Sequence, residues 1–331
     1  MPYYLLIIGD PTAVPLGFQF DLALQHAVGR VALDSPAAYG RYARSVLSAE
    51  EHSNPRSLDL EVFSVGHEGD EATALARKVL VGPTLKRLAK AEELTTRHVD
   101  GQAATKGVLS DAVAAGESSL LFAVSHAALF SPQSPRQRPC QGALVCADWP
   151  GTGPASASQY FAASDLNPDA DLTGRLLFLF GCHTAGTPHL DSFGVPGHGS
   201  RRRRRQLAPA PFIAALPSAL LSHPAGGALA VIAHVDRAFP QHLFGPLADG
   251  QSRVFESVLR QLLMGQRVGF AMESFGHRHG ELAARLLAQA FEAGDGDFDP
   301  LDGEALWTAY NDARSHIILG DPAVRLDAGS G

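Results

Sequence analysis

Residues 172–188, LTGRLLFLFGCHTAGTP, contain a short apolar run that begins just after Gly174 and stops at Gly181. A run of this length between glycines predicts a strand buried on both faces of a sheet. Cys182 follows at the point where that strand would end. In open parallel sheets, ligands and reacting groups gather at the carboxyl ends of the strands. Cys182 is therefore a candidate nucleophile, and its small neighbours would let a substrate backbone approach closely.

Two further apolar runs have the same form. Residues 119–124, SLLFAV, lead to His126, and residues 228–233, ALAVIA, lead to His234. Neighbouring strands of a sheet lie about 4.8 Å apart. If the three strands are parallel, a cysteine at one strand end and a histidine at the next come within hydrogen-bond reach. A Cys/His dyad needs this geometry.

His126 is the favoured base for Cys182. It precedes the cysteine by 56 residues, near the roughly 50 that separate the two groups in one class of cysteine protease. His183 is adjacent to the cysteine, and neighbouring side chains on extended backbone point to opposite faces, so it is a poor base. His234 is an alternative partner that either orients His126 or lines the substrate site with Asp236.

The amino-acid composition excludes several classes of protein. The 331 residues are 45% hydrophobic, enough for one large α/β domain or two smaller ones. A net charge of −7 argues against general nucleic-acid binding. The three cysteines are too few for a disulfide framework, and Cys140 and Cys146 lack the spacing of zinc ligands. No apolar run approaches the roughly 20 residues that span a bilayer, and the N-terminus lacks a signal-peptide pattern. We therefore expect a cytoplasmic protein without membrane contact.

The order of elements predicts an α/β fold with a mostly parallel sheet and helices on both faces. Beyond the three runs above, strands are expected at residues 3–8, 58–65 and 316–326, the last with a turn. Helices are expected at residues 20–28, 39–51, 71–93, 105–115, 212–222, 254–264 and 281–293. Residues 187–211 are rich in Gly, Pro and Arg and predict a long surface loop. Residues 1–100 form a leading α/β unit of the same sheet or a small subdomain, and residues 101–327 form the domain with the site.

Four segments in this order resemble the caspase-fold cysteine peptidases: LLFAVSHA, LLFLFGCHTAG, ALAVIAHVDRAF and ILGDPAVRL. Within that group the chain most resembles the CHAT and gingipain-like proteins. The resemblance covers residues 101–326 well and the first hundred residues loosely. It implies a caspase-like fold in which His126 is the catalytic histidine and Cys182 the nucleophile. The backbone N–H groups of Ala127 and Cys182 would form the oxyanion hole, with Ala127 standing where the family usually has glycine.

The function that follows is a cysteine endopeptidase that hydrolyses peptide bonds through a thioester, without a metal or an organic cofactor. Its substrate is a protein or peptide. We expect the substrate pocket to involve Asp148, Trp149, His234 and Asp236, whose carboxylates would favour a basic residue before the scissile bond. The alternative is a catalytically silent CHAT-like module that acts in protein–protein interaction or signalling with a regulatory partner.

Five consecutive arginines, from Arg201 to Arg205, repel one another and must be exposed. They follow Cys182 within the long loop, and exposed loop tips are where proteolytic cleavage concentrates. An enzyme that prefers basic residues would cut itself there. A plain solvated loop, or a basic patch for an acidic partner, is the slightly favoured interpretation.

Overall fold

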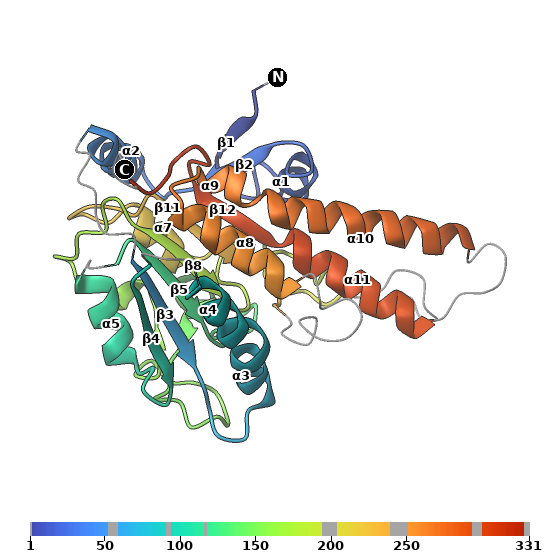
Figure 1. Ribbon diagram of the computed structural model, residues 1–331, viewed down its shortest axis with the longest axis horizontal. Helices are drawn as coiled ribbons and strands as arrows, with labels where there is room; N and C mark the ends of the chain where they lie inside the picture. Colours follow the sequence, from blue (N-terminus) through green and yellow to red (C-terminus); the bar gives the residue numbers. More distant parts are fainter. Residues whose placement is uncertain are drawn as a thin grey trace.

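The computed structural model describes residues 2–51, 59–90, 94–115, 118–193, 204–238, 251–292 and 300–327. An eight-stranded sheet runs through these ranges in the order β1-β2-β12-β11-β8-β5-β3-β4 (Figure 1). The strands are β1 (Tyr4–Ile8), β2 (Ala27–Val31), β3 (Leu60–Val65), β4 (Thr96–Gly101), β5 (Leu120–Val124), β8 (Leu176–Phe180), β11 (Ala230–His234) and β12 (His316–Gly320). The three apolar runs that the sequence singled out are β5, β8 and β11, and all their residues are buried.

The sheet is mostly parallel, as predicted. Strands β11, β8, β5, β3 and β4 run in one direction. Strands β1, β2 and β12 are parallel to one another, and the two groups meet at the antiparallel pair β11–β12. The carboxyl ends of β3, β5, β8 and β11 therefore share one edge. The first hundred residues supply strands to both ends of this sheet, so within the described residues they form part of the same sheet.

Helices cover both faces of the sheet. One face carries α3 (Glu71–Ala76), the π-helical turn η1 (Arg77–Val81), α4 (Gly82–Leu88), α8 (Gln251–Leu263) and α9 (Val268–Ala271). The other face carries α1 (Leu16–Leu22), α2 (Pro36–Glu51), α5 (Lys106–Ala115) and α7 (Ala215–Leu221). Alternation along β8 serves both cores: Phe178 stacks on Phe255 of α8, with ring centroids 5.4 Å apart, and Leu177 joins the opposite core. Burial of one such side chain stabilises the fold by about 1.5–3 kcal/mol.

Helices α10 (Glu273–Glu292) and α11 (Pro300–Arg314) form a hairpin that projects beyond the sheet (Figure 1). They pack on each other through Leu282, Leu306 and Ala309. Helix α11 then leads directly into β12, which brings its last turn next to the end of β11. No helix in the described ranges has an apolar stretch long enough to cross a membrane.

Short elements surround the edge where the strand ends meet. They are α6 (Gln137–Cys140), β6 (Leu144–Val145), β7 (Tyr160–Phe161), η2 (Ala163–Asp165), β9 (Gly186–Thr187) and β10 (Phe212–Ile213). The last two pair as an antiparallel ribbon at the two ends of the predicted loop, and β10 takes the first residues of the helix expected at residues 212–222, which begins only at Ala215. Part of that loop, residues 194–203, lies outside the described residues.

The helix expected at residues 20–28 is wrong, because α1 ends at Leu22 and β2 begins at Ala27. Arg30 interrupts the apolar pattern of β2, yet it is fully buried. Its guanidinium donates to the carbonyls of Gly9 and Val14 at 2.7 and 2.8 Å, so the charge is satisfied by chain oxygens. Strand β4 was missed because its side chains are polar and mostly exposed at the sheet edge, and α11 was not predicted.

Candidate active site

Three neighbouring strand ends supply the side chains of the candidate active site. Asp70 follows β3 at the start of α3, His126 follows β5, and Cys182 follows β8. Strand β5 lies between β3 and β8 and is parallel to both. The register pairs Val124 with Phe180, so the segments that follow β5 and β8 leave the sheet side by side. The predicted parallel neighbourhood of the His and Cys strands is thus confirmed.

His126 and Cys182 line one cavity of about 220 Å³. Thr73 and Ala76 from α3 form one side, and Ala238, just after β11, contributes to the lining. Both candidate side chains are partly buried. The cavity is therefore a place where a thiol and an imidazole face the same bound molecule.

Asp70 holds the imidazole of His126. The Nε2 atom of His126 lies 2.8 Å from Oδ2 of Asp70. The same carboxylate caps α3, accepting from the backbone N–H and the hydroxyl of Thr73 at 3.1 and 2.6 Å. Burial opposes ionisation of Asp70, but the bonds from Thr73 and the nearby His126 outweigh it and lower the pKa of the carboxyl. An ionised Asp70 fixes the Nε2–H tautomer, which leaves Nδ1 of the imidazole for proton transfer.

The thiol of Cys182 is protonated in this arrangement. Its Sγ lies 3.6 Å from the carbonyl oxygen of Ala238, to which the S–H donates. Burial raises the pKa of Cys182 to about 11, and the charges of Asp236 and Asp312 act in the same direction. The thiol therefore needs a base at the moment of attack.

Gly181 allows the two strand ends to approach each other. A Cβ atom at this position would come within 2.7 Å of the carbonyl oxygen of Ser125, so a larger residue would push the segments apart. Ser125 in turn donates its backbone N–H to the carbonyl of Phe180 at 3.1 Å, which extends the β5–β8 ladder to the edge of the site. This close approach sets the positions of His126 and Cys182.

The proposed oxyanion donors, the backbone N–H groups of Ala127 and Cys182, have no acceptor among the described residues. Ala127 forms an isolated bridge with Leu144, and the N–H of Val145 donates to His126 O at 2.9 Å. In the described ranges the non-glycine residues with positive φ are His183 and Asp236, so Ala127 occupies its position without that strain. Alanine is therefore compatible with the backbone conformation at this position.

Two aromatic groups lie behind His126. The indole of Trp149 meets the His126 ring edge to face with centroids 5.9 Å apart, so this predicted residue does reach the site. His67, in the turn after β3, stacks parallel to His126 at 6.3 Å. Burial lowers the pKa of His67, and the adjacent His126 adds to the effect. Its surroundings therefore favour the neutral form of His67.

None of the four predicted substrate residues lines this cavity, although Trp149 contacts the ring of His126. Asp148 accepts from the backbone N–H of Lys106 at 2.6 Å and so caps α5. His234 is fully buried, and its ring nitrogens contact Asp236 and Asp312 rather than His126. The suggestion that His234 orients His126 is therefore corrected, because Asp70 makes that contact.

Asp236 is also buried, with its two carboxylate oxygens accepting from the backbone N–H groups of Ser192 and Arg237. Burial and the charge of Asp191 raise its pKa to about 6. His183 has φ 58°, so the extended backbone assumed for it is wrong. Its ring is nevertheless buried, lies 3.2 Å from the hydroxyl of Thr187, and stays out of the cavity.

Sequence reasoning missed Asp70 and His67. Both belong to the turn GHEGD after β3, whose only available signal is an aspartate directly before a helix, the pattern of an N-cap. Of the arginine run, Arg204 and Arg205 are exposed, as expected, and the three residues before them lie outside the described ranges.

Comparison with known proteins gives a match at the level of solved structures. No family model matches the sequence, and no curated protein matches it. Gingipain R (RgpB), an Arg-specific cysteine proteinase, superposes on 98% of this chain with a TM-score of 0.50 and 12% identity. The complex of the pro- and mature domains of RgpB from Porphyromonas gingivalis gives the same three values. Another solved protease gives a TM-score of 0.52 and 13% identity over 98% of the chain.

The chain spans about two thirds of these proteins, namely 64% of the gingipain R chain, 65% of the RgpB complex chain and 64% of the other protease. At such low identity the match shows the fold, and the fold is the caspase-like α/β arrangement of the gingipain cysteine proteinases. The relation to CHAT proteins stays a prediction.

Proposed function

We propose that this chain is a cysteine endopeptidase whose nucleophile is Cys182 and whose general base is His126. One observation carries the proposal. The thiol and the imidazole line the same cavity at adjacent parallel strand ends, with the imidazole held through Nε2 by Asp70. This is a nucleophile, a base and a group that orients the base, the arrangement that activates a weak nucleophile.

In the mechanism, the thiol leaves Ala238 and passes its proton to Nδ1 of His126 as Sγ attacks the scissile carbonyl. The ionised Asp70 stabilises the imidazolium that forms, as a carboxylate does in other triads. The tetrahedral intermediate collapses to a thioester when His126 returns the proton to the leaving amine. Water, activated by the same imidazole, then hydrolyses the thioester. Because the pKa of Cys182 is about 11, proton removal accompanies attack instead of preceding it.

The N–H groups of Ala127 and Cys182 are the donors to the oxyanion in this proposal. Both are without an acceptor in the described ranges, so neither must break a bond to receive the developing charge. Preorganised donors of this kind contribute about 3–4 kcal/mol each to transition-state stabilisation.

Cleavage after a basic residue is the specificity that we propose. Asp236 lies at the end of the strand next to Cys182, and its charge acts on the thiol. Asp191, which raises the pKa of Asp236, already binds one guanidinium, since Arg237 donates to both of its oxygens at 2.7 Å. Because Asp236 is buried and Asp191 is paired with Arg237, a substrate arginine would have to replace the Arg237 guanidinium at Asp191. Self-cleavage in the run from Arg201 to Arg205 follows from the same preference.

One observation favours the alternative, a silent CHAT-like binding module: the thiol donates to Ala238 and not to His126. An acyloxymethyl ketone probe with arginine next to the reactive group distinguishes the peptidase from the silent binding module. The peptidase predicts covalent labelling of wild-type protein at Cys182 that is strongly slowed in His126→Ala, together with hydrolysis of a fluorogenic arginyl peptide. Absence of both labelling and hydrolysis between pH 5 and 9 would reject the peptidase.

A further inference from the structure

A second cluster of histidine and aspartate lies deep in the fold. His234 ends β11, His316 begins β12, and Asp312 lies in the last turn of α11. The exposed fractions of the three residues are 0%, 6% and 1%. His234 and His316 are in register across the antiparallel pair, which places their ring centroids 4.7 Å apart. One donor atom from each of the three side chains lies within 4.8 Å of the others.

The spacing of the atoms suits a small cation. Nε2 of His234 lies 3.3 Å from Oδ1 of Asp312 and 3.3 Å from its backbone oxygen. Nδ1 of His316 lies 3.2 Å from that same backbone oxygen. Ligands placed tetrahedrally around Zn²⁺ at about 2.0–2.1 Å stand about 3.3–3.4 Å from one another. The three contacts above therefore fall at the separations of zinc ligands, and the three side-chain donor atoms are close enough together to surround one ion.

The hydrogen-bonding capacity of His234 also favours a cation in the cluster. Both ring nitrogens of His234 face oxygens, because Nδ1 lies 3.4 Å from the carbonyl of Asp236. Carbonyl and carboxylate oxygens only accept, and a neutral imidazole has a single N–H. If Nδ1–H donates to Asp236, the lone pair of Nε2 points at the oxygens of Asp312. A cation between them removes this repulsion, and an Nδ1–H bond to a carbonyl is the outer contact that metal-bound histidines usually make.

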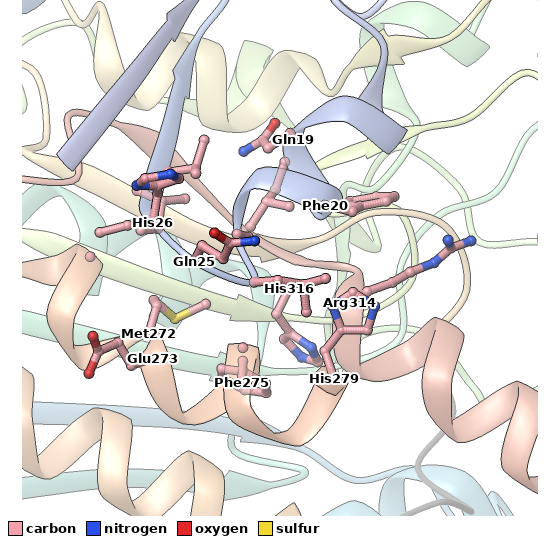
Figure 2. Close-up of a pocket in the computed structure, with 18 of the residues that line it drawn as sticks. Gln19, Phe20, Gln25, His26, Met272, Glu273, Phe275, His279, Arg314 and His316 are labelled. Atoms are coloured by element: carbon pink, nitrogen blue, oxygen red, sulfur yellow. The ribbon is translucent and has the colours of Figure 1, made fainter. Parts of the chain in front are cut away.

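A cavity of about 230 Å³ connects His316 to the surface. Figure 2 shows the rings of His316 and His279 beside each other, with Gln19 across from them. Gln25 and Leu24 on its rim are exposed. Of the three residues of the cluster, His316 lines this cavity, together with Gln19 and His279, and in the described ranges the Nε2 atoms of these three lining residues have no hydrogen-bond partner. A hydrated cation could enter through it and exchange water for imidazole at the inner end.

We propose that His234, Asp312 and His316 form a structural site for a zinc-class transition-metal ion. Imidazole nitrogen with one carboxylate is a ligand set that Zn²⁺ accepts readily. The site joins α11 and β12 to the end of β11, directly beside the strand that carries Cys182. Its role is to fix this corner of the sheet, and it takes no part in the proposed proton transfer. It does not depend on the proposed peptidase activity.

The test uses the full chain with Cys182→Ala, so that this thiol cannot bind the metal. The protein is loaded with ZnSO₄, dialysed without chelator, and its metal content is measured by mass spectrometry. We expect one zinc per chain, lowered at least tenfold in Asp312→Asn and in His234→Asn, with circular dichroism confirming that both fold. His223→Gln is the matched control, because His223 is an equally buried histidine on α7's side of the sheet with an unpartnered ring nitrogen, and it should keep full occupancy.

X-ray absorption on the zinc-loaded Cys182→Ala protein supplies a readout that does not require a folded ligand variant. Two imidazole nitrogens at about 2.0–2.1 Å and no sulfur in the zinc shell are expected. Failure of the loaded protein to retain zinc through dialysis would overturn the proposal. It would also fail if folded Asp312→Asn kept one zinc, or if sulfur appeared in the shell. In each of these three cases the cluster would be a hydrogen-bonded group of two histidines and an aspartate without a metal.

Discussion

The His126–Asp70 pair and the His234–Asp312 pair both lie at strand ends of one sheet, and they differ in their access to solvent. In the pair of His126 and Asp70 the side chains are 35% and 17% exposed, and the imidazole opens onto a cavity that holds a thiol. In the pair of His234 and Asp312 the values are 0% and 1%. The same two residue types can move a proton at the open site, because the imidazole keeps a free nitrogen there. In the buried pair both ring nitrogens of His234 face oxygens of the fold, so neither is left to exchange a proton with a substrate.

The largest effect expected at the open site comes from the nucleophile. Cys182→Ala should abolish hydrolysis of an arginyl peptide while the thermal unfolding temperature stays close to that of wild type, since only Sγ is lost at a strand end. His126→Ala should lower kcat by about 10²–10⁴-fold, the usual contribution of a positioned acid–base group. Cys140→Ala, which removes a half-buried thiol outside the cavity, is the control. Equal activity in wild type and Cys182→Ala would refute the assignment.

A smaller effect is expected from Asp70, which positions and stabilises the base. Asp70→Asn can still cap α3 but loses its charge. A hydrogen bond to a charged group contributes about 1.5–3 kcal/mol, so kcat should fall by about 10–100-fold with little change in KM. Asp165→Asn is the matched control, because Asp165 also caps a short helical turn. A KM effect without a kcat effect would show that Asp70 binds substrate and does not assist the base.

The burial of two further histidines, His183 and His279, is tested by the pH dependence of the free energy of unfolding. Burial lowers the pKa of His183 to about 3 and of His279 to about 4, whereas the unfolded chain titrates near 6.5. As pH falls below 6.5 the unfolded chain takes up protons that these folded histidines refuse, so each lowers stability by about 1.4 kcal/mol per pH unit. Asp236 acts oppositely between about 6 and 3.8, since its folded form binds the proton first, and it offsets one histidine.

The net prediction is a free energy of unfolding that decreases from pH 6.5 to pH 4. Urea unfolding at intervals of half a pH unit measures it. His279→Gln removes one of the titrating groups, so the slope of the free energy of unfolding against pH should fall by about 1.4 kcal/mol per pH unit. A stability that rises on acidification through this window would show that the buried histidines accept protons in the fold, contrary to their surroundings.

Much of the open site could be predicted, because its signals are local. Short apolar runs mark β5 and β8, and the second residue after each strand is His126 or Cys182. Asp70 was not predictable from such a pattern, since it meets His126 across 56 residues and looks like an ordinary helix cap. Its role exists only once β3 lies next to β5.

The buried cluster was still less visible in the sequence. His234 was placed in the substrate site because it follows an apolar run, as His126 does. Its true surroundings depend on the antiparallel pairing of β12, which brings His316 opposite it, and on a helix that the sequence analysis did not predict. Register between strands far apart in the chain is set by the packing of the whole sheet, and no short motif encodes it.

The smallest expected effect concerns His183, which is the sequence neighbour of the nucleophile but belongs to the buried region. Its φ of 58° lies in the left-handed range, where asparagine is among the better tolerated residues. His183→Asn should therefore fold, and kcat/KM should stay within about fivefold of wild type, which is about 1 kcal/mol. Its ring contacts Thr187 and not the cavity, so no proton route passes through it. Steady-state kinetics with the arginyl peptide, run beside His126→Ala, decides the point. If His183→Asn were as inactive as His126→Ala while still folded, the base would be the adjacent histidine, and the separation between the open and the buried pair would not hold.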